Sequence, residues 1–120
     1  MILGVEGIVK KVLKSEKTKT TSEVSVTFVD DKMIRDLNRK FRRIDRATDV
    51  LSFEMGEGSL LGDIVISFDA ARRNAKRYGI SIFEEIDRLA VHGALHLMGF
   101  DHKKRVDAKL MRIREDDYLA

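Results

Sequence analysis

The segment from Ser81 to Gly99 constrains the fold of this chain more than any other. Ser81 can cap a helix, and Glu84 stands three residues further on, as in a capping box. Apolar residues then recur at helical spacing and give one broad face, which comprises Ile82, Ile86, Leu89, Ala90, Gly93, Ala94 and Leu97. A polar stripe lies opposite that face, made of Glu85, Arg88, His92 and His96. The pattern predicts an amphipathic helix that ends at Gly99.

The other patterns along the chain predict an α+β fold. Helices are expected over residues 5–14, from Asp30 or Asp31 to Phe41, from Ser67 or Asp69 to Gly79, and over residues 103–118. Strands are expected over residues 24–28, 48–53 and 60–67, and a turn over residues 54–59 can join the last two as a hairpin. These elements predict a small mixed β-sheet of three to four strands packed with about five helices.

Two of the helices have narrower apolar stripes. The stripe of the helix after Asp30 comprises Met33, Ile34, Leu37 and Phe41, and that of the last helix comprises Val106, Leu110 and Ile113. We expect both stripes to face the core.

Composition limits the class of protein. The 120 residues suit one domain, 1–120, and no Pro- or Ser-rich linker divides them. The absence of cysteine excludes disulfides and cysteine-ligated metals. No apolar run approaches the roughly 18 residues of a membrane span, and the start of the chain has no signal-peptide pattern. We therefore expect a cytoplasmic protein with no membrane partner.

Positive charge is unevenly distributed, although the formal net charge is only +3. Basic residues gather between Lys32 and Arg46, where they are Lys32, Arg35, Arg39, Lys40, Arg42, Arg43 and Arg46. A second group comprises Arg72, Arg73, Lys76 and Arg77. Clustered cations are typical of proteins that bind a polyanion such as RNA. A solvated helix face explains either cluster equally well.

All three histidines of the chain lie within one short run. Because a helix turns about 100° per residue, His92 and His96 project from the same face one turn apart. Gly99 permits a sharp reversal that can bring His102 back toward the pair. Three protein ligands with an open fourth position are the mark of a catalytic zinc site. We therefore predict one Zn²⁺ on His92, His96 and His102, although nickel, cobalt or copper also suits imidazole ligands.

The histidine spacing is that of metzincin proteases, so the predicted helix is metzincin-like. Those enzymes have a glutamate directly after the first histidine, where it acts as general base. This chain has Gly93 at that position. Without that carboxylate a peptidase lacks its means of activating the zinc-bound water, so the pattern disfavours a protease.

The run His92-Gly93-Ala94-Leu95-His96-Leu97-Met98-Gly99-Phe100-Asp101-His102 strongly resembles the signature of the YbeY family of bacterial endoribonucleases. Thr48 to Phe53 and Leu61 to Ser67 resemble two further parts of that family's pattern. The resemblance implies a cytoplasmic, zinc-dependent, single-strand-specific endoribonuclease. It also implies a role in 16S rRNA 3′-end maturation and ribosome quality control, with single-stranded RNA, rRNA and the ribosome or small-subunit proteins as partners.

The chain departs from the family pattern at two places. Family members usually open with a strand, which here is missing or reduced to Ile2-Leu3, and the family's proline is replaced by Ala47. Neither change affects the predicted metal ligands.

The resemblance also suggests roles for the basic residues between the helix and the next strand. Arg42 matches the family's functionally important arginine, and a guanidinium there can hold phosphate oxygens as negative charge grows on them. Arg43 and Arg46 are expected to be general RNA contacts.

The sequence identifies no general base. Asp49, Asp63 and Asp101 are candidates, but each can equally be structural. Zinc lowers the pKa of bound water to about 7, so a side-chain base is not required. Ser52 and Ser67 have no histidine left to activate them. Two alternatives stay open, namely a zinc hydrolase of a non-RNA substrate and a non-catalytic ribosome-assembly or RNA-binding module with a structural zinc.

Overall fold

The computed structural model describes residues 7–9, 11, 23–57, 60–97, 112–113 and 115–119. Its elements follow in the order β1 (Glu23–Val29), α2 (Asp31–Arg42), β2 (Val50–Glu57), β3 (Leu60–Ser67), α3 (Phe68–Tyr78) and α4 (Ile82–Leu97). Residues 7–9, 11, 112–113 and 115–119 are also helical. The predicted α+β class is confirmed. The short strand considered at Ile2-Leu3 lies outside the described residues.

The described strands form one mixed sheet in the order β1-β3-β2. The central strand β3 pairs in parallel with β1 and antiparallel with β2, which confirms the predicted hairpin. The turn predicted over residues 54–59 was wrong in its first part, because β2 continues to Glu57. Pairing of Glu57 with Leu60 extends the ladder after a register shift that follows Glu54. An irregularity of this kind lets a strand tolerate the glycine that predicted a turn.

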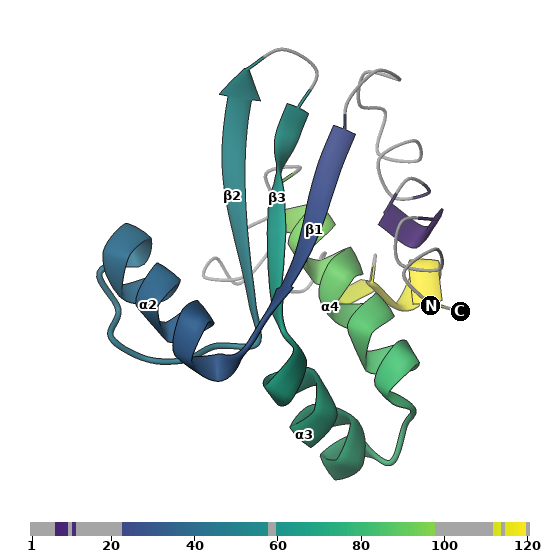
Figure 1. Cartoon of the computed structure of the whole chain (residues 1–120). Coiled ribbons are helices and arrows are strands. Elements are labelled where there is room, and N and C mark those ends of the chain that lie inside the picture. Colours follow the sequence, from purple (N-terminus) through teal and green to yellow (C-terminus); the bar gives the residue numbers. More distant parts are fainter. Residues whose placement is uncertain are drawn as a thin grey trace.

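The sheet separates two helical layers, with α2 on one face and α3 and α4 on the other (Figure 1). Successive strand residues point to opposite faces, so β3 contributes to both cores. Ile64 and Ile66 pack with Leu89 of α4, whereas Val65 packs with Ile34 of α2. Helix α4 is therefore held against the sheet along its broad apolar face.

The helix ends are fixed by the residues that the sequence indicated. Asp30 and Ser67 each accept a hydrogen bond from the backbone N–H three residues later, at 2.8 and 3.1 Å. Ser81 and Glu84 form the predicted capping box, with hydrogen bonds of 3.1 and 3.3 Å. Gly79 ends α3 with a φ of 67°, the left-handed conformation that glycine adopts without strain. These caps set where α4 begins and so which of its residues face the sheet.

The apolar stripe predicted for α2 was partly wrong. Ile34 is fully buried, but Met33 and Phe41 are 49% and 57% exposed. The buried partner of Ile34 is instead Asn38, one turn later and 4% exposed. Asn38 can occupy this position because its side chain donates to the carbonyl of Arg46 at 2.8 Å, which satisfies a buried amide.

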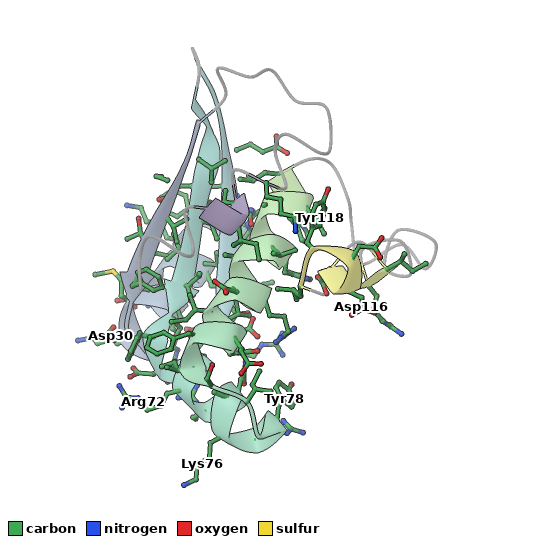
Figure 2. All side chains as sticks on the ribbon, turned by 90° about the vertical axis from the view of Figure 1, so that its right-hand side faces the viewer. Asp30, Arg72, Lys76, Tyr78, Asp116 and Tyr118 are labelled. Carbon is green, nitrogen blue, oxygen red and sulfur yellow. The ribbon has the colours of Figure 1, made fainter. Side chains whose placement is uncertain are left out.

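The last helix is described only in part, and the one described member of its predicted apolar stripe is exposed. Ile113 is 49% exposed, whereas Tyr118 is 8% exposed and belongs to the core that includes α4. Val106 and Leu110, the other members of the predicted stripe, lie outside the described residues. Figure 2 shows Tyr118 beside α4, with Asp116 projecting away from it. The described part of this helix thus contacts the core through Tyr118.

The second basic cluster lies on the outer side of α3, where Arg72 and Lys76 project away from the body of the protein (Figure 2). Within the described ranges, no helix is both long and apolar enough to cross a bilayer.

Candidate active site

Helix α4 presents two of the predicted metal ligands side by side. The ring centroids of His92 and His96 lie 5.4 Å apart, and both side chains are half-buried. Their spacing of one helical turn places them on the face that the sequence indicated. The third predicted ligand, His102, lies outside the described residues. Within those residues, no group of three or more histidine, aspartate or glutamate side chains is placed to hold a metal ion.

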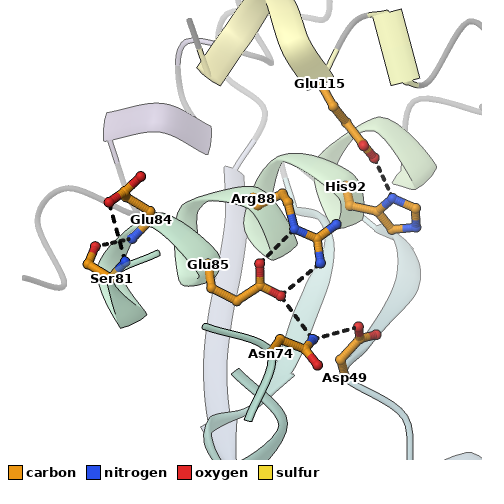
Figure 3. Close-up of polar contacts among 8 residues, drawn as sticks. All are labelled: Asp49, Asn74, Ser81, Glu84, Glu85, Arg88, His92 and Glu115. Carbon is orange, nitrogen blue, oxygen red and sulfur yellow. Dashed lines mark hydrogen bonds and ion pairs between the residues drawn. The ribbon is translucent and has the colours of Figure 1, made fainter. Parts of the chain in front are cut away.

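A carboxylate from the C-terminal helix orients the first of these histidines. Glu115 accepts a hydrogen bond from Nδ1 of His92 (Figure 3). A carboxylate at one ring nitrogen fixes the tautomer and directs the other nitrogen, Nε2, as a metal ligand. Glu115 reaches His92 because Tyr118, three residues later on the same helical face, is anchored in the core. Sequence reasoning missed Glu115, since nothing local distinguishes it from the acidic residues that follow it.

Arg42 is held in place by β2. Its Nη2 donates to the carbonyl oxygen of Ser52, and its guanidinium carbon lies 5.3 Å from the ring centroid of Phe53. The hydrogen bond from Nη2 and the contact with the Phe53 ring orient the guanidinium without neutralising its charge. Arg42, to which the resemblance assigns a functional role, is therefore exposed to solvent but held in one orientation.

Ser52 connects this arginine to the histidine helix. While its carbonyl accepts from Arg42, its hydroxyl donates to the carbonyl of Gly93 at 3.0 Å. Gly93 directly follows His92 in α4. One residue of β2 thus ties together the two sides of the site. The prediction that Ser52 is no activated nucleophile agrees with this structural use of its hydroxyl.

The close approach of α4 to the sheet explains the glycine after His92. A Cβ at Gly93 would lie 2.7 Å from Cγ2 of Ile64 and 3.1 Å from the Ser52 hydroxyl. Both distances are shorter than ordinary van der Waals contact. The position that bears the general base in metzincin proteases here faces the sheet, so no carboxylate at residue 93 can act at the histidines.

A cavity of about 350 Å³ brings the basic loop and the histidines together. Its lining comprises Asn38, Arg42, Ile44, Arg46, Thr48, Asp49, Val50, Leu51, Ser52, His92 and His96. A second hollow of about 300 Å³ adjoins it and shares Arg42, Ser52 and His96. Arg42 therefore stands between the two hollows, beside a predicted metal ligand.

The other two predicted RNA contacts have different positions. Arg46 lines the larger cavity, and the hydrogen bond from Asn38 to its carbonyl holds the loop that carries it. Arg43 is not among the residues that line either hollow. It ends α2 with a φ of 60°, where its N–H donates to the carbonyl of Arg39 at 3.1 Å. The structure thus brings Arg42 and Arg46, but not Arg43, to the histidines.

The aspartates considered as general bases lie in different places. Asp49 lines the cavity, while its carboxylate accepts from Asn74 at 3.3 Å. The Asp63 carboxylate accepts hydrogen bonds from the hydroxyls of Ser25 and Thr27, at 2.8 and 3.3 Å, and does not line the cavity. Asp101 lies outside the described residues. Asp49 is accordingly the described candidate that can reach a substrate.

A buried ionic network supports the site from below (Figure 3). Glu85 is fully buried and accepts two hydrogen bonds from Arg88, at 2.6 and 2.7 Å, and one from Asn74 at 2.9 Å. Asn74 also donates to Asp49, so the network reaches from α4 through α3 to the cavity wall. The hydrogen bonds to Glu85 raise the pKa of the Arg88 guanidinium, so Arg88 stays cationic. The polar stripe of α4 is therefore partly buried. Both carboxylate oxygens of its buried member, Glu85, accept hydrogen bonds.

The residues present suit a divalent metal ion. Two imidazoles a turn apart, one of them held by a carboxylate at Nδ1, would supply two of the three protein ligands of a catalytic zinc site. Such an ion would be held by His92 and His96 at the floor of an arginine-lined cavity.

The chain is similar to known endoribonucleases over nearly its whole length. A sequence model of "Endoribonuclease YbeY" matches residues 3–120. The chain is 46% identical over 125 residues to the endoribonuclease YbeY of Desulforamulus reducens, covering 96% of this chain and 82% of that protein. It is 47% identical over 120 residues to that of Pelotomaculum thermopropionicum, covering 92% and 79%. The chain therefore belongs to the endoribonuclease YbeY family.

The fold has a counterpart among solved structures. The solution structure of the Thermotoga maritima protein TM1509 matches with a TM-score of 0.70 at 28% identity, covering 98% of this chain and 78% of that one. The family expected from the sequence, and the enzyme class of endoribonuclease that goes with it, are confirmed.

Proposed function

We propose that this chain is a zinc-dependent endoribonuclease that cuts single-stranded RNA in the cavity between Arg42 and the His92–His96 pair. The observation that carries the proposal is the composition of that cavity. It combines two arginines, Arg42 and Arg46, with two histidines on one helical face. Cations that bind phosphate oxygens and imidazoles that bind a metal are the two requirements of metal-assisted phosphodiester hydrolysis.

The side chains have separable tasks in this proposal. Arg46 holds the strand through its phosphates, which is a sequence-independent contact. Arg42 holds the non-bridging oxygens of the reacting phosphate, and its fixed orientation against Ser52 and Phe53 means that little reorganisation is needed as charge grows. His92, His96 and His102 hold the metal, which supplies Lewis-acid polarisation and a water of lowered pKa when bound.

The biological role proposed is maturation of the 16S rRNA 3′ end and ribosome quality control in the cytoplasm. Its support is the family to which the chain belongs, together with the basic residues beside the cavity. The partners would be rRNA and the ribosome or its small-subunit proteins. In cells that lack the protein, 16S rRNA should extend beyond its mature 3′ end. Sequencing of that end through a ligated adaptor measures this.

The decisive experiment combines metal analysis with RNA cleavage. The purified chain should contain about one zinc per molecule, and it should cut a labelled single-stranded RNA but not the same strand in a duplex. A chelator should abolish cleavage, and added Zn²⁺ should restore it. His96→Ala should lose both metal and cleavage while the far-UV circular dichroism spectrum is retained.

Matched variants test the nucleic-acid side of the proposal. Arg46→Glu, in the cavity lining, should weaken binding of single-stranded RNA, whereas Arg72→Glu, on the outer side of α3, should have a smaller effect. A metal-free chain that takes up no zinc would contradict the metal centre. A zinc-loaded chain that binds RNA without cutting it would instead favour a non-catalytic assembly module.

A further inference from the structure

Phe41 is the most exposed large apolar side chain among the described residues, at 57%. It stands at the end of α2 directly before Arg42, which lines both hollows, although Phe41 itself lines neither. A phenyl ring left mostly in water beside a candidate active site is unusual, because rings of this size are normally buried. Exposed apolar surface beside a binding site can serve as a contact for a ligand.

The ring is held in position although it is exposed. Its centroid lies 5.5 Å from that of Phe53 in an edge-on arrangement, with the two planes at 67°. The Arg42 guanidinium lies over the same Phe53 ring at 5.3 Å. Phe53 therefore fixes the Phe41 ring and the phosphate-binding arginine relative to each other, and each keeps a surface for a ligand.

The surroundings of Phe41 are cationic. Lys40 Nζ lies 5.4 Å from its ring centroid, and Arg42 follows directly in the chain. Ile44, 42% exposed, adds an apolar side chain to the lining of the cavity. An apolar protein segment covering this ring would bring no counter-charge for Lys40 and Arg42. A nucleotide brings a flat base and a phosphate together, which matches both features.

We propose that Phe41 is a stacking platform for an unpaired nucleobase next to the phosphate that Arg42 holds. This inference rests on the RNA-cleaving function proposed above and adds a binding site to it. A base inside a duplex is stacked on both sides by its neighbours, so it cannot also cover a protein ring. The platform thus accounts physically for a preference for single strands, and because every base has a π-face, it requires little sequence preference.

The test is single-turnover cleavage of a labelled single-stranded RNA by the zinc-loaded chain, which separates the half-saturating enzyme concentration from the plateau rate. Phe41→Ala should raise the half-saturating concentration about tenfold, the usual order for one lost base–aromatic stack, with a smaller change in plateau rate. Phe41→Trp and Phe41→Tyr should retain tight binding, whereas Phe41→Leu should behave like alanine. Phe83→Ala is the matched control, because Phe83 is 51% exposed at the start of α4, more than two helical turns before His92.

An RNA with abasic residues flanking the cleaved bond shows whether the ring contacts a base. The wild-type chain should bind this strand less tightly, and Phe41→Ala should add no further loss. The platform would be overturned by a Phe41→Ala variant that loses as much affinity for the abasic strand as for the intact one. A Phe41→Leu variant that binds RNA as tightly as wild type would overturn it too. So would a Phe41→Ala variant with unchanged half-saturation but reduced self-association, which would assign the ring to a protein contact. A wild-type chain that cuts no RNA would instead overturn the proposed function, and the platform with it.

Discussion

Glu115 and His92 are hydrogen-bonded across two elements that the sequence places 23 positions apart. The bond joins the C-terminal helix to α4 at the first predicted metal ligand, and Glu115 is itself largely buried, with its side chain 14% exposed. A partner of this kind fixes the direction of the imidazole ring. The C-terminal helix is therefore part of the proposed metal centre.

This contact predicts that Glu115 sets metal affinity. Glu115→Ala should weaken zinc binding by about 10- to 100-fold, the usual effect of losing an outer carboxylate. Glu115→Gln keeps a hydrogen-bond acceptor without the charge, so its zinc affinity should lie between those of wild type and Glu115→Ala. Competition with a chromogenic chelator at fixed pH measures the affinity. Asp116→Asn is the control, because Asp116 is exposed and projects away from α4. Equal affinity in the alanine variant and the wild type would remove Glu115 from the metal centre.

A second prediction concerns Arg42. If Arg42 acts on charge that grows in the transition state, its loss should affect the rate more than substrate binding. Arg42→Ala should keep zinc content and fold, and should cleave on the order of a hundredfold more slowly at saturating enzyme, as for loss of one oxyanion donor. Arg42→Lys should recover only part of the rate, because an ammonium cannot reproduce the planar fork.

The matched control for Arg42 is its neighbour. Arg43→Ala removes the same charge one residue away, at the end of α2 and outside the cavity lining. It should leave the saturated cleavage rate within about twofold of wild type. Saturated rates that are equal in Arg42→Ala and wild type would show that Arg42 serves binding alone.

The parts of this site that follow from local spacing could be predicted, and the parts that depend on long-range packing could not. His92 and His96 are one helical turn apart, so any helix there must bring them together. Capping residues such as Ser81 form hydrogen bonds with residues three positions away, so the local sequence predicts them equally well. Glu115 approaches His92 only because Tyr118 docks in the core, and no local pattern contains that information. Phe41 was assigned to the core by its spacing, whereas the buried amide of Asn38 shifts the contact face of α2.

The steric finding at Gly93 gives a third prediction. Gly93→Ala would place a methyl group 2.7 Å from Ile64, so the helix or the strand must move. Overpacking of this order should lower the free energy of unfolding by about 1–3 kcal/mol. The shift should also weaken zinc binding, because His92 is the preceding residue. Denaturant unfolding and metal competition measure the two effects.

Gly7 is the control for this change, since it is also helical and a Cβ there would meet no atom within 4 Å. Gly7→Ala should be neutral or stabilising by up to about 1 kcal/mol. A Gly93→Ala variant as stable as wild type would show that α4 does not need its close approach to the sheet.

The last prediction concerns acid stability and Asp31, which joins α2 to α3. Its carboxylate accepts from Arg73 at 2.6 Å and from the Ser67 hydroxyl at 2.8 Å. The hydrogen bond from Arg73 is the main reason that the pKa of Asp31 lies below its ordinary value in the folded chain. A carboxyl whose pKa is lowered by folding stabilises the protein above its unfolded pKa, about 3.9, and the stabilisation is lost as pH falls through the lower folded pKa.

Asp31→Asn should therefore lower the free energy of unfolding at pH 7, by about 1 kcal/mol for a partly exposed site. The difference from wild type should stay constant down to about pH 5, shrink as the pH falls below about 4, and disappear once both states of the wild type are protonated. Urea unfolding across a pH series measures it. Asp36→Asn serves as the control, because Asp36 contacts Arg39 at 3.5 Å on an exposed helix face and should contribute little at any pH. A difference for Asp31→Asn that grows toward acid pH would have the opposite sign and would rule out the ion pair as the source of the stabilisation.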